Sequence, residues 1–197
     1  MKVLAIMGSP RKGKNNDRLL NYILEGISRR EASGVVEKLY VSDLAIAPCL
    51  ACDACTRRSG CIQKDSMETL YKKFDEADLI IITSPMYFNS ISGQLKAIID
   101  RNQAIWSSKY VLKESIIDKA KRRVGYVLIT AGADEHPYGL SAVTPIMDLF
   151  FKSINTDYWG NYFVNGVDET PAYSRKQVIE DMLEIGEKIV EYYRSLV

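Results

Sequence analysis

Hydrophobic residues along this chain follow two alternating patterns, short apolar runs and longer stretches with helical spacing. Apolar or β-rich runs, which are typical of buried strands, predict strands at residues 2–7, 35–41, 77–85, 123–132 and 158–164. Apolar positions spaced three or four residues apart predict helices at residues 15–27, 66–74, 92–105, 140–154 and 174–196. This alternation predicts the α/β class, as a doubly wound five-stranded parallel sheet with helices on both faces.

The pattern shows one unit rather than several. No linker, low-complexity tract or internal repeat interrupts it, so we expect a single domain over residues 1–197, with a cysteine-rich loop at 48–64. Ligands of such sheets bind outside the carboxyl ends of the strands. The loops after the first, third and fourth predicted strands are therefore the expected place for function.

Composition and charge exclude several classes of protein. The net charge of +1 does not favour a nucleic-acid binder, and 47% hydrophobic residues argue against disorder. No apolar run reaches the roughly eighteen residues of a membrane span, and the N-terminal run is too short for a signal peptide. We therefore expect a cytoplasmic protein that does not bind membranes. A reducing compartment disfavours structural disulfides.

The loop after the first strand reads GSPRKGKNN, residues 8–16, and opens the first helix. Gly8 permits an unusual backbone angle, and a helix N-terminus attracts anions. Together with polar and basic side chains, this predicts a monophosphate site; the alternative is a loop with an asparagine N-cap. Neither a Walker A loop nor the dinucleotide glycine pattern is present. The candidate binding residues are Ser9, Arg11, Asn15 and Asn16, with Lys12 or Lys14 as further sources of charge.

The loops after the third and fourth strands offer a different chemistry. Pro85 ends the third strand, and Tyr87 and Phe88 provide aromatic surface for a planar ring, unless they only cover the edge of the sheet. After the fourth strand, the small residues at 130–132 would let such a ring approach the backbone closely. That assignment rests on the expected topology alone.

All four cysteines lie within thirteen residues, at Cys49, Cys52, Cys55 and Cys61. Zinc sites usually divide their ligands into two separated pairs, whereas one compact run suits a [4Fe–4S] cube, whose irons each need one thiolate. Zinc and free redox-active thiols remain alternatives. Nearby basic residues could offset the negative charge of a thiolate-ligated cluster; these are Arg57, Arg58 and Lys64.

Two motifs resemble one known family. GSPRKGKNNDRLL and SPMYFNSISGQLKAIIDR are similar to segments of the flavodoxin-like NAD(P)H-dependent FMN reductases and iron–sulfur flavoproteins, which also carry a compact cysteine run between the second and third strands. The resemblance implies an FMN phosphate at the first loop, although family members usually have Ser or Thr at the place of Asn16. It implies a flavin ring lined by Pro85, Met86, Tyr87, Phe88 and Asn89. The candidates at the next strand end come from the expected topology and not from the resemblance; they are Thr130, Ala131 and Gly132.

The resulting hypothesis is an oxidoreductase, an iron–sulfur flavoprotein that transfers electrons between a [4Fe–4S] cluster and FMN. Such transfer needs no catalytic acid or base, and His136, the only histidine, is interpreted as structural. The redox partner would be a ferredoxin, a quinone or NAD(P)H, and the family implies a homodimer or homotetramer, with residues 92–106 as a plausible contact face. The alternatives are an NAD(P)H-dependent FMN or quinone reductase without a functional cluster, and a flavodoxin-like module with zinc on the cysteine loop.

Overall fold

The computed structural model describes residues 1–134 and 138–197, and its centre is a five-stranded parallel sheet. The strand order is β2-β1-β3-β4-β5, the flavodoxin-like order, so the predicted fold class is confirmed. The chain crosses from one side of β1 to the other after β2, which makes the space at the carboxyl ends of β1 and β3 a topological switch point. The strands are β1 (Lys2–Met7), β2 (Val35–Tyr40), β3 (Leu79–Pro85), β4 (Val124–Thr130) and β5 (Asp157–Val164).

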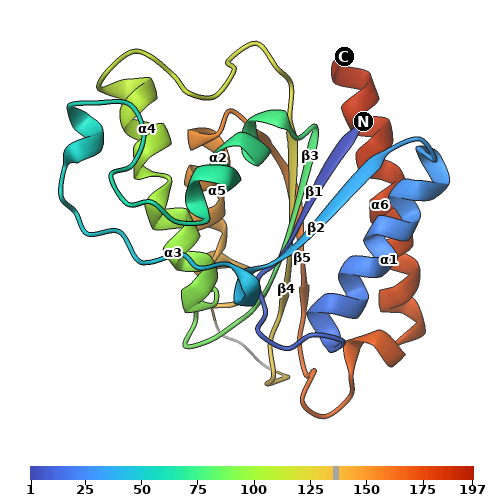
Figure 1. The fold of residues 1–197 in the computed structure, drawn as a ribbon. Helices are drawn as coiled ribbons and strands as arrows, with labels where there is room; N and C mark the ends of the chain where they lie inside the picture. Colours follow the sequence, from blue (N-terminus) through green and yellow to red (C-terminus); the bar gives the residue numbers. More distant parts are fainter. Residues whose placement is uncertain (135–137) are drawn as a thin grey trace.

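Helices cover both faces of this sheet (Figure 1). On one face lie α1 (Asn15–Arg30) and α6 (Lys176–Leu196), which pack against each other. The opposite face carries α2 (Met67–Glu76), α3 (Gly93–Arg101), α4 (Gln103–Tyr110) and α5 (Thr144–Ser153). Within the parts of the chain that the structure describes, no helix is long and apolar enough to cross a bilayer.

Two predicted helices differ from those observed. The helix expected over 92–105 is divided at Asn102, whose backbone N–H donates to Ile99 O at 3.0 Å in a tighter turn and whose amide donates to Ile98 O at 2.9 Å. The helix expected from residue 140 begins at Thr144 instead. Pro145 explains this later start, because proline is tolerated in the first turn of a helix but not in its interior.

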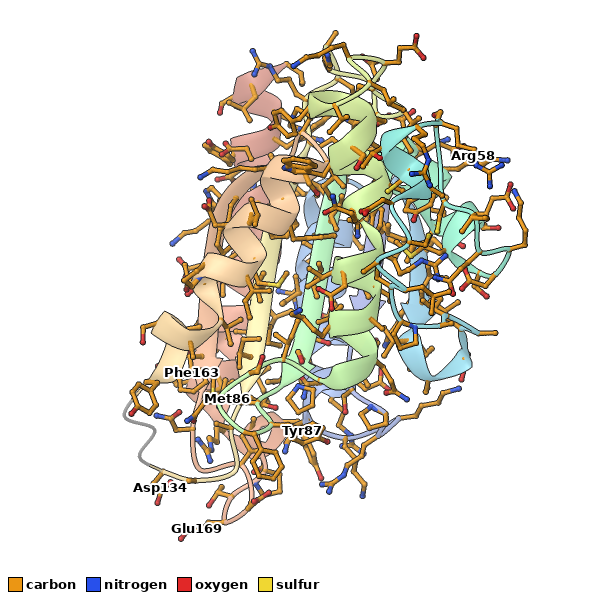
Figure 2. The ribbon with its side chains drawn as sticks, turned by 90° about the vertical axis from the view of Figure 1, so that its left-hand side faces the viewer. Arg58, Met86, Tyr87, Asp134, Phe163 and Glu169 are labelled. Atoms are coloured by element: carbon orange, nitrogen blue, oxygen red, sulfur yellow. The ribbon has the colours of Figure 1, made fainter. Side chains whose placement is uncertain are left out.

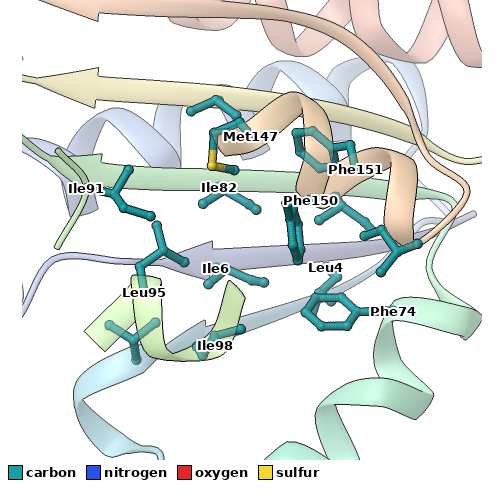
Figure 3. Packing of buried hydrophobic residues seen from close by; sticks show 14 of the residues in the cluster. Leu4, Ile6, Phe74, Ile82, Ile91, Leu95, Ile98, Met147, Phe150 and Phe151 are labelled. Carbon is teal, nitrogen blue, oxygen red and sulfur yellow. The ribbon is translucent and has the colours of Figure 1, made fainter. Parts of the chain in front are cut away.

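The strands separate two hydrophobic cores, because alternate residues of a strand point to opposite faces. In β1, Leu4 and Ile6 belong to the core under α3 and α5, whereas Val3 and Met7 belong to the core under α1 and α6. Figure 3 shows the first core, in which Leu4, Ile6 and Ile82 of the sheet face Phe74, Leu95, Ile98, Met147, Phe150 and Phe151 of the covering helices. Burial on both faces keeps the central strands and their loops in fixed positions.

Candidate functional site

A polar cavity of about 210 Å³ lies where the strands end. It draws residues from the loops after β1, β3, β4 and β5, which topology brings to one edge of the sheet. Figure 2 shows Met86 and Tyr87 at this end of the molecule, with Asp134 and Glu169 nearby. The lining residues are Ser9, Arg11, Lys14, Asn15, Asn16, Pro85, Met86, Tyr87, Thr130, Gly132, Val167 and Asp168.

Gly8 determines how the first loop leaves the sheet. Its N–H donates to the carbonyl oxygen of Thr83 at 2.7 Å, and a Cβ added at Gly8 would lie only 2.3 Å from that oxygen. Gly8 is not among the residues with a positive φ angle, so glycine is required here for close approach and not for the unusual backbone angle that the sequence suggested. Ser92 then ties the loop to α3, because its hydroxyl donates to Gly8 O at 2.6 Å and accepts from Leu95 N.

Two of the polar candidates of the first loop have a fixed orientation. Asn15 Oδ1 accepts from the N–H of Ala172 at 2.8 Å, which leaves its amide N–H groups for a ligand. The amide of Asn16 donates to Thr130 Oγ1 at 2.7 Å, and its Oδ1 is buried without a hydrogen-bond partner among the described residues. Asn16 therefore presents an acceptor to the cavity, and a ligand hydroxyl could satisfy it.

Positive charge reaches the cavity from only part of the basic loop. Arg11 and Lys14 line it, together with the buried Ser9. Lys12 turns away, since its ammonium lies 2.6 Å from Asp43 Oδ2 and stacks over the ring of Tyr40. Of the two lysines considered from the sequence, Lys14 is thus the one at the cavity.

Asp17, in the first turn of α1, stabilises the loop that follows β1. Its carboxylate accepts from the N–H of Gly13 at 2.6 Å and pairs with Lys38 of β2 and Tyr40. Burial opposes ionisation of Asp17, but these hydrogen bonds and the charge of Lys38 outweigh it and lower the pKa of Asp17. The ionised carboxylate therefore holds the phosphate-loop candidate against the sheet at neutral pH.

The loop after β3 forms a tight hairpin turn over residues 87–90. Tyr87 and Ser90 exchange two backbone hydrogen bonds, of 2.8 and 3.0 Å. Phe88 and Asn89 between them have φ angles of 48° and 57°, the geometry of a type I′ turn without glycine. A phenylalanine in this region is strained, and such strain is concentrated at functional sites. Pro85, Met86 and Tyr87 line the cavity, whereas Asn89 and the fully exposed Phe88 do not.

At the end of β4, Thr130 and Gly132 line the cavity, and Ala131 is buried behind it with its N–H bonded to Val164 O. No sequence motif predicted Val167 and Asp168, which enter from the loop after β5. The available signal was topological, because β5 is parallel to β4 and ends at the same edge. His136 lies outside the described residues.

The four cysteines lie elsewhere, on the long connection between β2 and α2. All of them line a second cavity, of about 30 Å³, with Arg101, Gln103 and Ala104 from the junction of α3 and α4. Cys49 and Cys52 are exposed, Cys55 and Cys61 are half-buried, and Cys55 Sγ lies 3.5 Å from Ser107 Oγ of α4. Within residues 1–134 and 138–197, no three side chains of His, Cys, Asp or Glu are grouped to hold a metal ion.

The basic residues named from the sequence do not line this second cavity. Arg57, Arg58 and Lys64 are exposed, and Lys64 lies 3.5 Å from Glu68. In Figure 2, Arg58 lies far from Met86 and Tyr87, on the side of the molecule that carries the cysteine loop. The cation at the thiols is Arg101, which no sequence motif indicates, because its pairing with Asp65 depends on tertiary packing.

Comparison with known proteins places this architecture in a family. A family model described as NADPH-dependent FMN reductase matches residues 1–141. An iron-sulfur flavoprotein of Methanosarcina thermophila is 34% identical over 116 residues, which span 59% of this chain and 60% of that protein. An NAD(P)H:quinone oxidoreductase of Solanum tuberosum is 30% identical over 184 residues, spanning 92% of this chain and 84% of that protein.

Solved structures agree on the fold. A flavone reductase superposes with a TM-score of 0.75 over the whole of this chain and 64% of its own, at 16% identity, which is a likeness of fold alone. The aligned region covers less than two thirds of the Methanosarcina protein, so that relative has sequence without a counterpart in the match. The chain belongs to the NADPH-dependent FMN reductase family, and its relatives in that family include iron-sulfur flavoproteins.

Proposed function

We propose that the chain is an FMN-containing iron–sulfur flavoprotein that transfers electrons between a [4Fe–4S] group and FMN. The observation that supports this most directly is that all four cysteines line one cavity, apart from the polar cavity at the strand ends. Each cavity has the donor chemistry of one redox group, and α3 runs from a contact with the first loop to the cysteine cavity. In this proposal Cys49, Cys52, Cys55 and Cys61 are the ligands of the cluster.

The phosphate of FMN fits the part of the first cavity at the start of α1. Arg11 and Lys14 bring positive charge, and the unpaired N–H groups of the helix N-terminus favour an anion. The free amide of Asn15 and the Ser9 hydroxyl would add hydrogen bonds to the phosphate. Asn16 suits a different part of FMN, because its unpartnered Oδ1 can accept from a hydroxyl of the ribityl chain.

The flavin ring fits the part of the cavity formed by the loop after β3. Pro85, Met86 and Tyr87 offer apolar and aromatic surface, and Gly132 opposite presents no side chain of its own. We propose that Phe88, Asn89 and Ala131 hold the shape of this region without lining it. When bound, FMN supplies a group that accepts one or two electrons. No residue is needed as a catalytic acid or base for that transfer.

The thiol set fits an iron–sulfur group by its chemistry. Cysteine thiolates are the usual ligands of such clusters, and four of them are available on one loop. Ala51 and Asp53, between the first three cysteines, have φ angles of 49° and 55°, a strain that a bound group can compensate. A cavity of about 30 Å³ holds only one or two waters, so the loop must open outward to take up a cluster.

The α3 helix links the proposed redox groups within one chain. Its N-cap Ser92 touches the first loop, and its last residue Arg101 lines the thiol cavity. Nine residues at 1.5 Å each make it about 13 Å long. External electrons would come from NAD(P)H, a quinone or a ferredoxin, and we propose a cytoplasmic homodimer or homotetramer.

A reductase without a functional cluster is the second candidate. The observation in its favour is that the described thiols are not gathered around a metal-sized space. In this case NAD(P)H would reduce FMN, and a quinone or free FMN would accept the electrons. A flavodoxin-like module with zinc on the cysteine loop is the third.

One analysis distinguishes the three candidates. The protein is purified without oxygen, its visible spectrum is recorded, and FMN, iron, sulfide and zinc are measured per chain. The proposal predicts FMN together with about four irons and four sulfides. One zinc without sulfide would contradict it and favour the third candidate. FMN without metal, with oxidation of NAD(P)H by the cluster-free protein, would favour the second.

A further inference from the structure

We propose that Arg101 is a positioning residue for the cysteine loop: with Asp65 it closes the base of the loop and holds a buried positive charge at the four thiols. This inference rests on the proposed function, since the charge is directed toward an anionic iron–sulfur group. The two parts can be tested separately, because the closure needs the forked geometry of the guanidinium, whereas a lysine in its place would retain the charge.

The closure joins the two ends of loop 48–64. Arg101 Nη1 donates to Asp65 Oδ2 at 2.6 Å and to Ala47 O at 2.9 Å, and Nη2 donates to Asp65 Oδ1 at 3.1 Å. Asp65 in turn accepts from Ala47 N at 3.2 Å and from Met67 N at 3.0 Å. Ala47 immediately precedes the loop and Asp65 immediately follows it, so one ion pair holds both ends together.

A second pair of contacts reinforces this base. Ser66 N donates to Ala45 O at 3.1 Å, and the Gln63 amide donates to Pro48 O at 3.1 Å. The remainder of the loop has only one short 3₁₀ turn, η2 (Ala54–Thr56), which contacts α4. The arrangement of the cysteines therefore depends on how the ends of the loop are held.

The charge of Arg101 is buried next to the thiols. Its side chain is 1% exposed, and it lines the cavity that all four cysteines share. Nη1 and Nη2 are used in the closure, while Nε has no hydrogen-bond partner among the described residues. A buried donor without a partner is unfavourable, and a thiolate or sulfide sulfur would satisfy it.

The surroundings keep Arg101 charged. A guanidinium is not deprotonated in proteins, and this one donates two hydrogen bonds to the carboxylate of Asp65. Gln103 and Ala104 of α4 also line the cavity. The charge of Arg101 favours negative charge on the loop.

A cluster with four thiolate ligands becomes more negative when it takes up one electron. A nearby buried cation stabilises the reduced form more than the oxidised form, and thus raises the reduction potential. Removing the charge of Arg101 should therefore lower that potential. We expect about a tenfold change in the reduction equilibrium, which corresponds to 59 mV for one electron.

The test compares Arg101→Met, which removes the charge, with Arg101→Lys, which retains it but cannot form the two-pronged pair with Asp65. Arg57→Met is the matched control, an exposed arginine of the same loop outside the cavity. Each variant of the 197-residue chain is reconstituted with iron and sulfide, and its potential is measured by mediated titration with dithionite as the electron donor. Hydrogen exchange of residues 45–66 is measured separately in the metal-free protein.

Arg101→Met should lower the potential, speed iron loss to a chelator about tenfold and raise exchange at the base of the loop, with FMN content unchanged. Arg101→Lys should recover the potential but not the protection from exchange, and Arg57→Met should match the wild type. Wild-type potential and exchange in Arg101→Met would overturn the inference while leaving the proposed function intact. If Arg101→Met does not fold, a wild-type exchange pattern in Arg101→Lys overturns the closure. A wild type that takes up no iron and sulfide would overturn the proposed function and the role of the charge together.

Discussion

The cavity at the strand ends and the cavity at the cysteines are built on different kinds of backbone. The strand-end cavity is formed by four loops, and each loop directly follows a strand of the parallel sheet. The cysteine cavity rests on one long connection whose only regular elements are η1 (Val41–Asp43) and η2. Strands buried on both faces cannot shift without disrupting two cores, whereas a loop can move at small cost.

This difference explains why the strand-end cavity measures about 210 Å³ and the cysteine cavity only about 30 Å³. Most polar groups at the strand ends already have the partners that orient them, as Asn15 and Ser92 do. The ends of the cysteine loop are held together by Arg101 and Asp65. Among the described residues, however, the cysteines are not grouped closely enough to hold a metal ion. A ligand at the first cavity meets a preformed pocket, and a ligand at the second must complete its own pocket.

The largest expected effect is on metal content. Cys52→Ser should remove most of the bound iron and sulfide, because a hydroxyl is a poor substitute for a soft thiolate. FMN content should remain at the wild-type level, since the cavities share no residue. Iron, sulfide and flavin analysis measures both, with Ser59→Ala on the same loop as control. Equal loss of flavin and iron would show that the two regions are not independent.

A steric change at the first loop should come next. Gly8→Ala places a Cβ 2.3 Å from Thr83 O, backbone of a central strand that cannot yield easily. We expect a loss of about 2–3 kcal/mol in the free energy of unfolding, measured by urea titration. Gly93→Ala is the control, because its Cβ would meet nothing within 4 Å at the start of α3. That variant should be neutral or gain up to about 1 kcal/mol, and similar losses in both variants would refute the close approach at Gly8.

Removing charge from the phosphate region should have a more moderate effect. Arg11→Ala should weaken FMN binding about tenfold, as expected for one charge-assisted hydrogen bond. Lys12→Ala should have little effect, because Lys12 pairs with Asp43 outside the cavity. Flavin fluorescence titration measures both constants, and the difference should shrink at high salt. Equal effects of the two substitutions on FMN binding would contradict the placement of Arg11 at the phosphate and Lys12 outside the cavity.

The smallest effect concerns pH and Asp17. A carboxyl whose pKa is lowered by folding stabilises the protein above its unfolded pKa of about 3.9, and this stabilisation is lost as pH falls through the folded value. Asp17→Asn should therefore be less stable than the wild type by about 1 kcal/mol at pH 7, and the gap should close below about pH 4. Urea unfolding at several pH values tests this. A gap independent of pH would contradict an ionised Asp17.

Sequence patterns predicted the parts of the molecule that depend on periodicity. The buried runs identified five strands, and the polar and aromatic loops between them converge at one edge, as parallel strands require. Periodicity could not show that Asn102 divides a helix, since that depends on one side-chain hydrogen bond. It also could not choose Lys14 over Lys12, because the choice depends on where Asp43 lies in space.

Tertiary contacts between distant segments could not be predicted from the sequence either. Arg101 lies 40 residues after Cys61 in a segment that reads as an ordinary amphipathic helix, and only the packing of α3 against the loop reveals its buried pairing with Asp65. Asp168 similarly belongs to a loop with no motif of its own. The spacing of the cysteines could predict the four candidate thiol ligands. The small size of the cavity between them depends on how the loop packs, which the spacing does not show.

Two redox groups on one chain should take up more electrons than FMN alone, and an anaerobic reductive titration measures this uptake. Reconstituted protein is titrated with dithionite while the flavin and cluster absorbances are followed. The account predicts about three electron equivalents per chain, two taken up by FMN and one by the iron–sulfur group. Uptake of two equivalents, with only the flavin bands bleached, would contradict it.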